Sequence, residues 1–342
     1  MIYLSIFLMQ FISLVKGKAR GICIFAVGLY IALVAGFRSI NIGIDTRSYF
    51  NVFMDAAPLS LYAIFDKASM EPGYCLFNYF ICNLFGNFQV LLILISLFFV
   101  LTVSFLIYRY SRIPWMSFFL FVTFGFLTFS MSGLRQTIAI GLCVLCFLFM
   151  KNRKFIISVI CLVSAVFFHY SAIFFVPVYF IDRLKWTKRN VAISIFIGAV
   201  VFIFSSLIFS FINNYARMSY ESMDTGGNLM LLFNLFIVFI GLVYKDKIIA
   251  KDAVNSFFFY SMVFTVILFP LCKFHPAMFR TTFYYYIFMI IYIPNVIVSI
   301  NDSTTRLLLT MLIISVAVYF FLYKVMIDIN QFYPYQFFWE VN

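Results

Sequence analysis

Residues 21–50 read GICIFAVGLYIALVAGFRSINIGIDTRSYF, and this stretch decides how the chain must fold. Its first 17 residues carry no charge, whereas the 13 that follow hold two arginines and an aspartate. An apolar run of this kind suits a helix that crosses a lipid bilayer, which needs ~20 residues. The sequence therefore predicts a membrane helix that ends near Arg38, followed by a polar loop outside the bilayer.

The composition extends this prediction to the whole chain. Sixty-five per cent of the 342 residues are hydrophobic and 11% are charged, whereas soluble domains carry ~25% charged residues. Apolar runs of about twenty residues recur from end to end, which is typical of a polytopic α-helical membrane protein. We therefore predict an all-α fold in which residues 1–342 form a single integral membrane domain. A transmembrane barrel would instead show ~10-residue alternating segments, which the sequence lacks.

Clusters of Lys and Arg predict which loops face the cytoplasm, because cytoplasmic loops are enriched in these residues. They lie at residues 16–20, 109–112, 151–154, 183–189 and 245–251. Placing all of them inside predicts about twelve membrane segments with both termini outside. The predicted segments are residues 1–15, 21–37, 89–108, 114–130, 133–150, 155–168, 170–181, 190–212, 228–244, 254–270, 283–300 and 307–323.

Three stretches depart from simple membrane helices. Residues 38–72 form the longest polar stretch, and we predict an external loop with short interfacial or re-entrant helices, one of them amphipathic near Tyr49. The short run 74–86 is predicted to be interfacial or re-entrant. The run 155–181 lies between two basic clusters and must return to its own side, so we predict a broken or re-entrant hairpin that turns near His169. Such breaks are tolerated where they line a cavity or are buried in protein.

Neither a metal site nor a nucleotide site is indicated, and we predict no cofactor. The seven cysteines lie mostly in apolar runs, and Cys143 and Cys146 have no second pair or histidine beside them, so we interpret them as core residues. The two histidines form no metal-binding pair, and no phosphate-binding glycine loop occurs. The net charge of +12 is expected to orient the chain and to contact anionic membrane lipid, not nucleic acid.

Three arginines on the predicted external face are candidates for binding phosphate groups. Arg135 opens an uncharged run after Gly133, where free helix N–H groups already favour anions, and arginine binds phosphate bidentately. Arg280 precedes the tyrosines at 284–286, and Arg38 ends its helix. Each arginine has a simpler interpretation: contact with lipid headgroups, an interfacial anchor, or a cation that the helix dipole favours.

Three further groups on this face are candidates for proton transfer, namely Asp45, Glu71 and His169. Ionisable groups at membrane depth are costly and by default mark functional sites. The simpler interpretation is a helix cap for each acid and a hydrogen-bonded core residue for the histidine. With the arginines they suit a substrate with a lipid tail, a diphosphate and a polar head. The arginines would offset charge on a leaving diphosphate, and one of the three groups would deprotonate an acceptor hydroxyl. Aromatic residues at 284–286 and 332–339 could form faces for sugar rings or an interfacial belt.

A series of short motifs resembles the EpsG-type, Wzy-like polysaccharide polymerases of bacterial O-antigen and exopolysaccharide assembly. The motifs are R-x6-D-T-x2-Y at residues 38–49, E-P-G-Y at 71–74, L-R-Q at 134–136, H-Y-S-A at 169–172, and an arginine at 280 before a tyrosine-rich helix. The resemblance implies three sets of active-site residues, and no metal among them. These are Asp45, Glu71 and His169 for catalysis, Arg38, Arg135 and Arg280 for the diphosphate, and Tyr49, Tyr74, Gln136 and Tyr284 for positioning the substrate.

The resemblance also implies a GT-C-like membrane glycosyltransferase of the bacterial inner membrane whose active site faces the periplasm. Such enzymes polymerise oligosaccharide repeat units carried on undecaprenyl diphosphate, with a flippase and a chain-length regulator as neighbours. Two alternatives stay open: a ligase that transfers the same glycan to lipid A core, and a flippase or transporter of lipid-linked oligosaccharide. A transporter predicts polar residues through the whole membrane depth, whereas the ionisable groups here gather toward one side.

Overall fold

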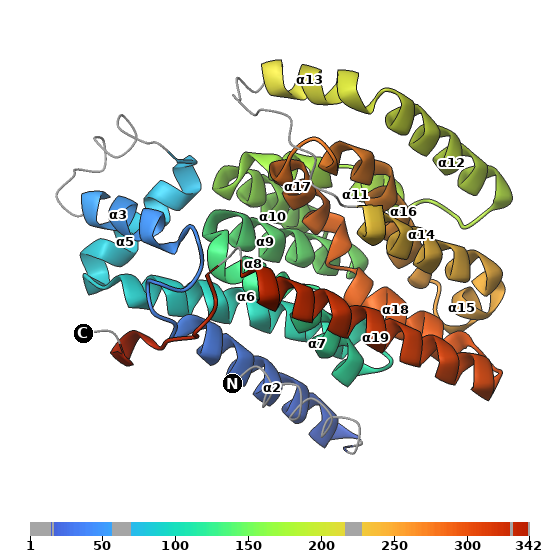
Figure 1. Ribbon diagram of the computed structural model, residues 1–342, viewed down its shortest axis with the longest axis horizontal. Helices are drawn as coiled ribbons and strands as arrows, with labels where there is room; N and C mark the ends of the chain where they lie inside the picture. The colour runs from blue at the N-terminus through green and yellow to red at the C-terminus, as the bar shows by residue number, and fades with distance from the viewer. Residues whose placement is uncertain (1–14, 16, 57–69, 216–227, 329–330, 341–342) are drawn as a thin grey trace. The chain divides into compact units, whose positions relative to one another are not determined.

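The computed structural model describes residues 15, 17–56, 70–215, 228–328 and 331–340. These residues form helices joined by short connections, and the described part of the chain contains no strand, only one isolated antiparallel bridge between Arg38 and Phe337 (Figure 1). The predicted all-α class is confirmed. The chain divides into two compact units, Met1–Ile173 with Leu309–Asn342, and Phe174–Leu308.

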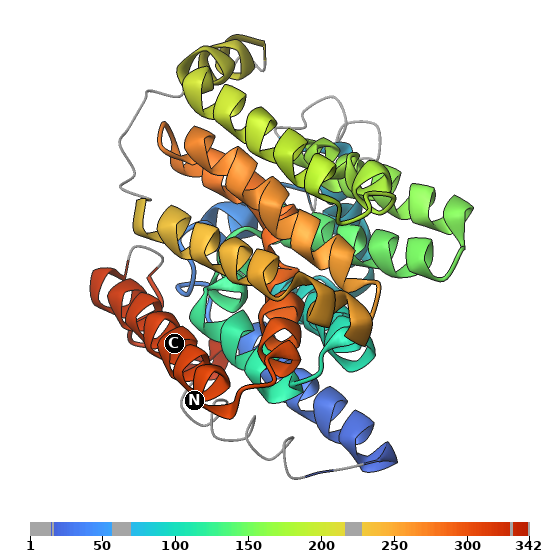
Figure 2. The same ribbon diagram turned by 90° about the vertical axis from the view of Figure 1, so that its right-hand side faces the viewer.

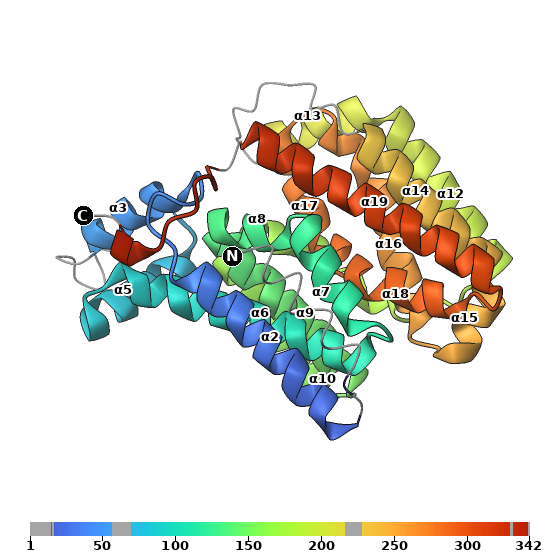
Figure 3. The ribbon, with the colours of Figure 1, turned by 60° about the horizontal axis from the view of Figure 1, so that its bottom comes forward.

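Four helices pack in sequence in the first unit, because each carries an almost continuous apolar surface. α2 packs along α6, α6 against α9, and α9 against α10 (Figure 3). Their bounds are Lys18–Gly36 for α2, Phe88–Tyr110 for α6, Leu134–Lys151 for α9 and Phe155–Phe168 for α10.

Two shorter helices of the first unit occupy the predicted external loop and the run after it. α3 (Thr46–Ala56) packs against α5 (Pro72–Phe85), and α5 also contacts α6 and α10 (Figure 1). α3 is amphipathic as predicted, since Tyr49 and Phe53 are buried while Arg47, Asn51 and Asp55 are exposed. Met54, predicted to lie on the apolar face, is exposed. Residues 57–69 of the predicted loop lie outside the described residues.

A bend in the first unit depends on a glycine. α7 (Pro114–Thr123) and α8 (Phe126–Ser132) meet at 49°. Gly125 between them has φ of 86°, a value that glycine adopts readily. The Nζ of Lys324 donates to the carbonyl oxygen of Phe124 at the bend, at 2.7 Å.

The second unit is organised around α16 (Asn255–Cys272), which contacts every other long helix of that unit. Figure 2 shows α16 in orange between α14 in gold and α12 in yellow-green. The other helices are α11 (Val178–Ile181), α12 (Lys188–Ile203), α13 (Ser205–Tyr215), α14 (Asn228–Val243), α15 (Lys245–Lys251), α17 (Pro276–Tyr286) and α18 (Met289–Ser299).

The described residues hold between five and nine candidate membrane spans by length and composition, which supports a multi-pass membrane protein. The five single helices are α2, α6, α9, α16 and α19 (Ser303–Ile327). Four bent pairs qualify if each pair counts as one span: α7 with α8, α12 with α13, α14 with α15, and α17 with α18.

The predicted count of about twelve segments is therefore not confirmed. The first predicted segment, residues 1–15, lies almost entirely outside the described residues. Two further segments were the legs of the hairpin at 155–181, and neither is a long helix. α10 has 14 residues, which at ~1.5 Å each reaches about 21 Å, less than the ~30 Å hydrocarbon core. The second leg is a 3-10 helix, Tyr170–Phe175, followed by the four residues of α11. The predicted break at His169 is confirmed.

Candidate active site

The site centres on Glu71, whose carboxylate lies between a guanidinium and an imidazole. Arg135 Nη1 donates to Glu71 Oε2, and His169 Nδ1 lies 2.5 Å from Glu71 Oε1. The Glu71 side chain is 5% exposed, whereas those of Arg135 and His169 are 26% and 24% exposed. A buried carboxylate thus holds two groups that remain accessible. We call these three residues the Glu71 cluster.

Three helix ends bring the Glu71 cluster together. Glu71 is the N-cap of α5, Arg135 is the second residue of α9, and His169 is the C-cap of α10. The Glu71 side chain makes no capping hydrogen bond to its own helix, so the capping interpretation is wrong for this residue. Glu71 has an extended backbone before Pro72, and its carboxylate is bound by residues of the other two helices.

The E-P-G-Y motif explains why α5 approaches α10 so closely. A Cβ atom on residue 73 would lie 2.7 Å from the Phe167 ring and 2.8 Å from the Phe167 carbonyl oxygen. Real Cβ atoms essentially never come this close, so glycine is required where α5 meets the last turn of α10. Glu71 and His169 are brought together because residue 73 has no side chain.

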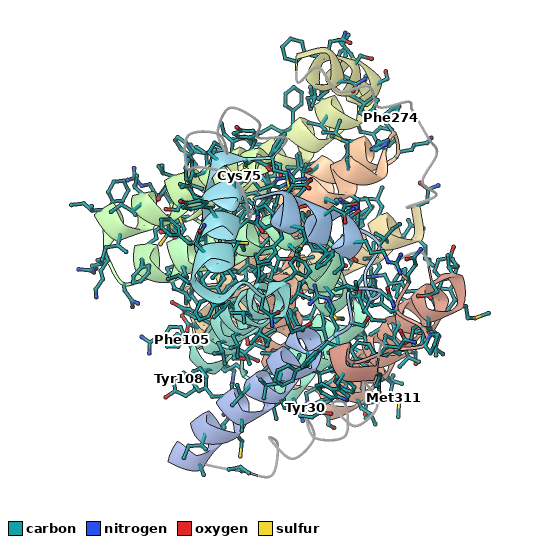
Figure 4. The ribbon with its side chains drawn as sticks, turned by 90° about the vertical axis from the view of Figure 1, so that its left-hand side faces the viewer. Tyr30, Cys75, Phe105, Tyr108, Phe274 and Met311 are labelled. Carbon is teal, nitrogen blue, oxygen red and sulfur yellow. The ribbon has the colours of Figure 1, made fainter. Side chains whose placement is uncertain are left out.

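Two tyrosines form the wall of the Glu71 cluster on the α3 side. The Tyr49 hydroxyl lies 3.5 Å from Arg135 Nε, and the Arg135 guanidinium carbon is 5.9 Å from the centre of the Tyr49 ring, within the range of a cation–π contact. Tyr74 is fully buried, and its ring meets that of Tyr49 edge-on at 5.4 Å. Figure 4 shows α5, marked by Cys75, lying beside α3. The predicted pair Tyr49 and Tyr74 therefore belongs to this site.

The cluster holds Glu71 as a permanent anion. Burial alone would raise the pKa of the Glu71 carboxyl. The hydrogen bond and charge of His169 and the charge of Arg135 outweigh burial, so the pKa falls from the ordinary 4.5 to about 2. Burial raises the pKa of the Tyr74 hydroxyl well above its ordinary value, so that group stays neutral. A fixed negative charge therefore orients both the guanidinium and the imidazole.

A model of the EpsG family matches residues 21–337, which include every residue of the Glu71 cluster. The chain belongs to the EpsG family. Membership points to a membrane polysaccharide polymerase that acts on lipid-linked saccharides. No curated protein and no solved structure matches the chain. Among the described residues of this EpsG-family protein, no group of three or more His, Cys, Asp or Glu side chains is placed to hold a metal ion.

Arg38 has a different environment from Arg135 in this EpsG-family protein. Its side chain is fully buried, with Nη1 donating to the Ala35 carbonyl at 2.7 Å and Nη2 donating to the Met131 carbonyl at 2.8 Å. These carbonyls lie in the last turns of α2 and α8, where the helix dipole favours a cation. Burial lowers the pKa of Arg38 to about 10, so the guanidinium is still charged at neutral pH. We call Arg38 and the two helix ends the Arg38 junction.

Asp45 and Gln136 are neighbours of site residues along the chain. Asp45 is partly exposed, and its backbone carbonyl accepts a hydrogen bond of 3.1 Å from the Tyr49 N–H in the first turn of α3. Gln136 is buried and directly follows Arg135 in α9. The catalytic role of Asp45 and the positioning role of Gln136 stay predictions.

Arg280 and Tyr284 belong to α17 of the second unit. Arg280 is exposed, whereas Tyr284, Tyr285 and Tyr286 are fully buried. These three rings lie in the protein core and form no exposed aromatic face in this structure. The roles predicted for Arg280 and Tyr284 toward the substrate stay predictions.

The C-terminal segment has a structural role that the sequence did not predict. Ser39 N–H donates to the Gln336 carbonyl and Phe338 N–H donates to the Phe37 carbonyl, both at 2.9 Å. Residues 336–338 therefore run beside residues 37–39 and cover the backbone of the Arg38 junction. The aromatic run at 332–339 was the only signal in the sequence, and aromatic composition does not identify a pairing partner.

Proposed function

We propose that this protein is a glycosyltransferase that polymerises oligosaccharide repeat units carried on undecaprenyl diphosphate. It would act in the bacterial inner membrane with the Glu71 cluster on the periplasmic side. The observation that carries the proposal is the carboxylate of Glu71, bound at once by Arg135 and by Nδ1 of His169, at the meeting point of three helix ends. Family membership supplies the class of reaction, and the cluster supplies the groups that this reaction needs.

His169 is the general base of the proposed reaction. When Nδ1–H donates to the Glu71 carboxylate, the lone pair lies on Nε2, which is the arrangement of an imidazole that accepts a proton. Nε2 removes the proton from a hydroxyl of the acceptor sugar, and that oxygen forms a bond to the anomeric carbon of the donor glycan. The bond from the anomeric carbon to the diphosphate oxygen breaks, and its electron pair leaves with the diphosphate.

Arg135 stabilises the departing diphosphate. One edge of its guanidinium is held by Glu71 and one side is covered by Tyr49, so the group is fixed before the substrate binds. A preorganised cation is most effective where negative charge develops in the transition state. Arg280 keeps its predicted role toward the diphosphate as a separate proposal, to be tested by its own substitution. Arg38, whose guanidinium is buried, would only hold the ends of α2 and α8 together.

Glu71 acts through its neighbours in this proposal. The carboxylate is too buried to be a main contact of the acceptor, and its constant negative charge stabilises the imidazolium that forms on His169. The proposed partners are the lipid-linked donor and acceptor, membrane lipid, and a flippase and chain-length regulator that supply and limit the polymer. No step of the proposed reaction requires a metal ion or a nucleotide.

The test is complementation of a deletion strain, with the surface glycan resolved by gel electrophoresis. The wild-type gene should restore a ladder of polymer, whereas Arg135→Ala and His169→Gln should give lipid-linked single repeats at normal protein abundance. His275→Asn is a matched control, because His275 caps α17 by accepting from Ala277 N–H and asparagine also caps helices. A ladder of normal length from Arg135→Ala would overturn the proposed role of the cluster. A deletion strain that lacks all transferred glycan would indicate a ligase or a flippase instead.

A further inference from the structure

A groove of about 340 Å³ is lined in part by α3, the helix that also contributes Tyr49 to the wall of the Glu71 cluster. Its volume falls in the usual range for small-molecule sites, ~300–1,000 Å³. We call it the α3 groove. Its walls come from residues 39–40, from α3, from the turn between α5 and α6, and from the C-terminal segment, all within the first unit. The residues used below are Ser39, Phe50, Asn87, Phe88, Gln89 and Phe338.

The lining of the α3 groove combines aromatic rings with uncharged polar groups. Phe50, Phe88 and Phe338 contribute rings, and Ser39, Asn87 and Gln89 contribute a hydroxyl and two amides. None of the nine lining residues is ionisable. This chemistry suits a neutral ligand with both apolar faces and hydroxyl groups, because rings pack against C–H faces while amides donate to and accept from hydroxyls. A phosphate would find no countercharge there.

The two amides are already fixed in place. Asn87 Oδ1 caps α6 by accepting from Gln89 N–H at 2.8 Å, which leaves the Asn87 amide nitrogen as a donor. Gln89 Nε2 donates to the Gly36 carbonyl at 2.5 Å, which leaves Gln89 Oε1 as an acceptor. One donor and one acceptor held by the fold are the usual means of orienting a ligand in an otherwise apolar pocket.

The helix α3 forms a wall of both sites. Tyr49 contacts Arg135 of the Glu71 cluster, while the next residue, Phe50, lines the α3 groove and packs edge-on against Phe88 at 5.4 Å. Successive residues of a helix point about 100° apart, so the two sites adjoin neighbouring faces of the same helix. The charged part of such a ligand matches the cluster, and an uncharged part matches the groove.

We propose that the α3 groove binds neutral sugar residues of the glycan whose diphosphate end reacts at the Glu71 cluster. This inference rests on the proposed function, since it assigns a second part of the same substrate. The groove is a binding subsite, and its residues take no part in the transfer of the glycan. Phe338 supplies a wall of the groove that only the folded C-terminal segment provides.

The test is direct binding of a lipid-free oligosaccharide, released by mild acid from the cell's own lipid-linked repeats, to the purified full-length protein. Trp339 follows Phe338, with ring centres 4.9 Å apart, so Trp115→Phe with Trp186→Phe leaves it as the only tryptophan reporter. Calorimetry on the protein with all its tryptophans gives a second measurement should these replacements disturb folding. We expect saturable binding that Phe338→Ala weakens about tenfold, as for an aromatic anchor. Asn87→Ser, which keeps a capping oxygen but removes the amide nitrogen, should weaken binding similarly.

The matched control is Phe80→Ala, because Phe80 is 54% exposed and Phe338 is 43% exposed, and Phe80 does not line the groove. Its binding should equal that of the wild type. Unchanged binding by both Phe338→Ala and Asn87→Ser would overturn the proposal. Displacement of the oligosaccharide by undecaprenyl phosphate would also overturn it, because the groove would then bind a lipid tail. Oligosaccharide binding without polymerisation would refute the proposed function and leave the groove assignment standing. Polymerisation with unaltered binding by the groove variants would refute the groove alone.

Discussion

The Glu71 cluster and the Arg38 junction each contain an arginine, but the two arginines have different roles. Arg135 is partly exposed and its partner is a carboxylate from another helix. Arg38 is fully buried and its hydrogen-bond acceptors are the backbone carbonyls of Ala35 and Met131. The first arrangement leaves donors for a ligand, whereas the second uses the planar fork of the guanidinium to join two helix ends.

This difference shows why an arginine beside a membrane helix cannot be assigned from its position alone. Both residues adjoin apolar runs, and both are members of motifs that resemble those of the same family. The two arginines differ in their partners. Arg135 pairs with a carboxylate in a partly open site and can still donate to a ligand. Arg38 donates to backbone carbonyls in a closed site and stabilises the fold. Substitutions in the two regions should therefore affect different measurements.

The largest expected effect is the loss of activity from Glu71→Gln. Glutamine keeps the size of the side chain but removes the charge that orients His169 and holds Arg135. In enzymes where a carboxylate orients a catalytic histidine, the amide variant loses ~10⁴-fold in rate, and we expect a loss of about 10³-fold or more here. Polymer formation per molecule of purified protein, measured with lipid-linked repeats, checks this prediction.

Asp55→Asn is the control for Glu71→Gln, because Asp55 is an exposed carboxylate on α3. It should polymerise at the wild-type rate. If Glu71→Gln also keeps at least a tenth of that rate, the cluster is a structural ion pair and does not differ in kind from the Arg38 junction.

The next effect concerns the approach of α5 to α10. Gly73→Ala places a methyl group 2.7 Å from the Phe167 ring and 2.8 Å from the Phe167 carbonyl oxygen, so α5 must shift away from α10. Overpacking of this kind costs ~1–3 kcal/mol, and the shift also separates Glu71 from His169. We expect a lowered melting temperature and a polymerisation rate reduced by about 10–100-fold, since ~1 Å of misplacement costs about this much.

Gly198→Ala is the control for Gly73→Ala. In α12, a Cβ atom on residue 198 would meet only Ile267 Cγ1 at 3.5 Å, an ordinary contact. This variant should be as active and as stable as the wild type or slightly more stable, because alanine favours helices. An active, stable Gly73→Ala protein would show that α5 and α10 are not held as closely as the structure has them.

Much of the fold and part of the site follow from the sequence. Apolar runs predict the helices, and the basic clusters on both sides of residues 155–181 predict a broken pair that turns near His169. The number of membrane spans is predicted poorly where helices bend or are shorter than the bilayer, because hydropathy depends on composition and not on the direction of the chain. The motifs predict that Glu71, Arg135 and His169 belong to one site. They do not predict that Arg38 and Tyr284 are fully buried, because burial depends on neighbours distant in sequence.

Because Arg38 is fully buried, its substitution should lower the stability of the protein and leave the reaction rate unchanged. Lysine at position 38 keeps the charge but cannot donate to the Ala35 and Met131 carbonyls in the same fork geometry. One buried carbonyl then loses its partner, at a cost of ~1–3 kcal/mol. Arg38→Lys should therefore melt at a lower temperature while the folded protein keeps its rate per molecule. Arg47→Lys is the control, because Arg47 is exposed and donates to Asn41 Oδ1. A stable but inactive Arg38→Lys protein would contradict the structural role.

The smallest effect is a pH dependence that belongs to the Glu71 cluster and not to the Arg38 junction. The pKa of Glu71 is lowered from 4.5 to about 2 in the folded protein. The stability that its charge contributes is therefore fully present above pH 4.5 and is lost as the pH falls toward 2. The difference in melting temperature between wild type and Glu71→Gln should be smaller at pH 3 than at pH 5.

The corresponding difference for Arg38→Lys should not change between pH 7 and pH 3, because the pKa of Arg38 is about 10 and its hydrogen-bond acceptors are carbonyls that do not titrate. Thermal unfolding of the three proteins in one detergent at pH 7, 5 and 3 measures both differences together. Parallel pH profiles for the two variants would mean that the stability of the Glu71 cluster comes from packing, and the distinction drawn between an ionic site and a backbone junction would then fail.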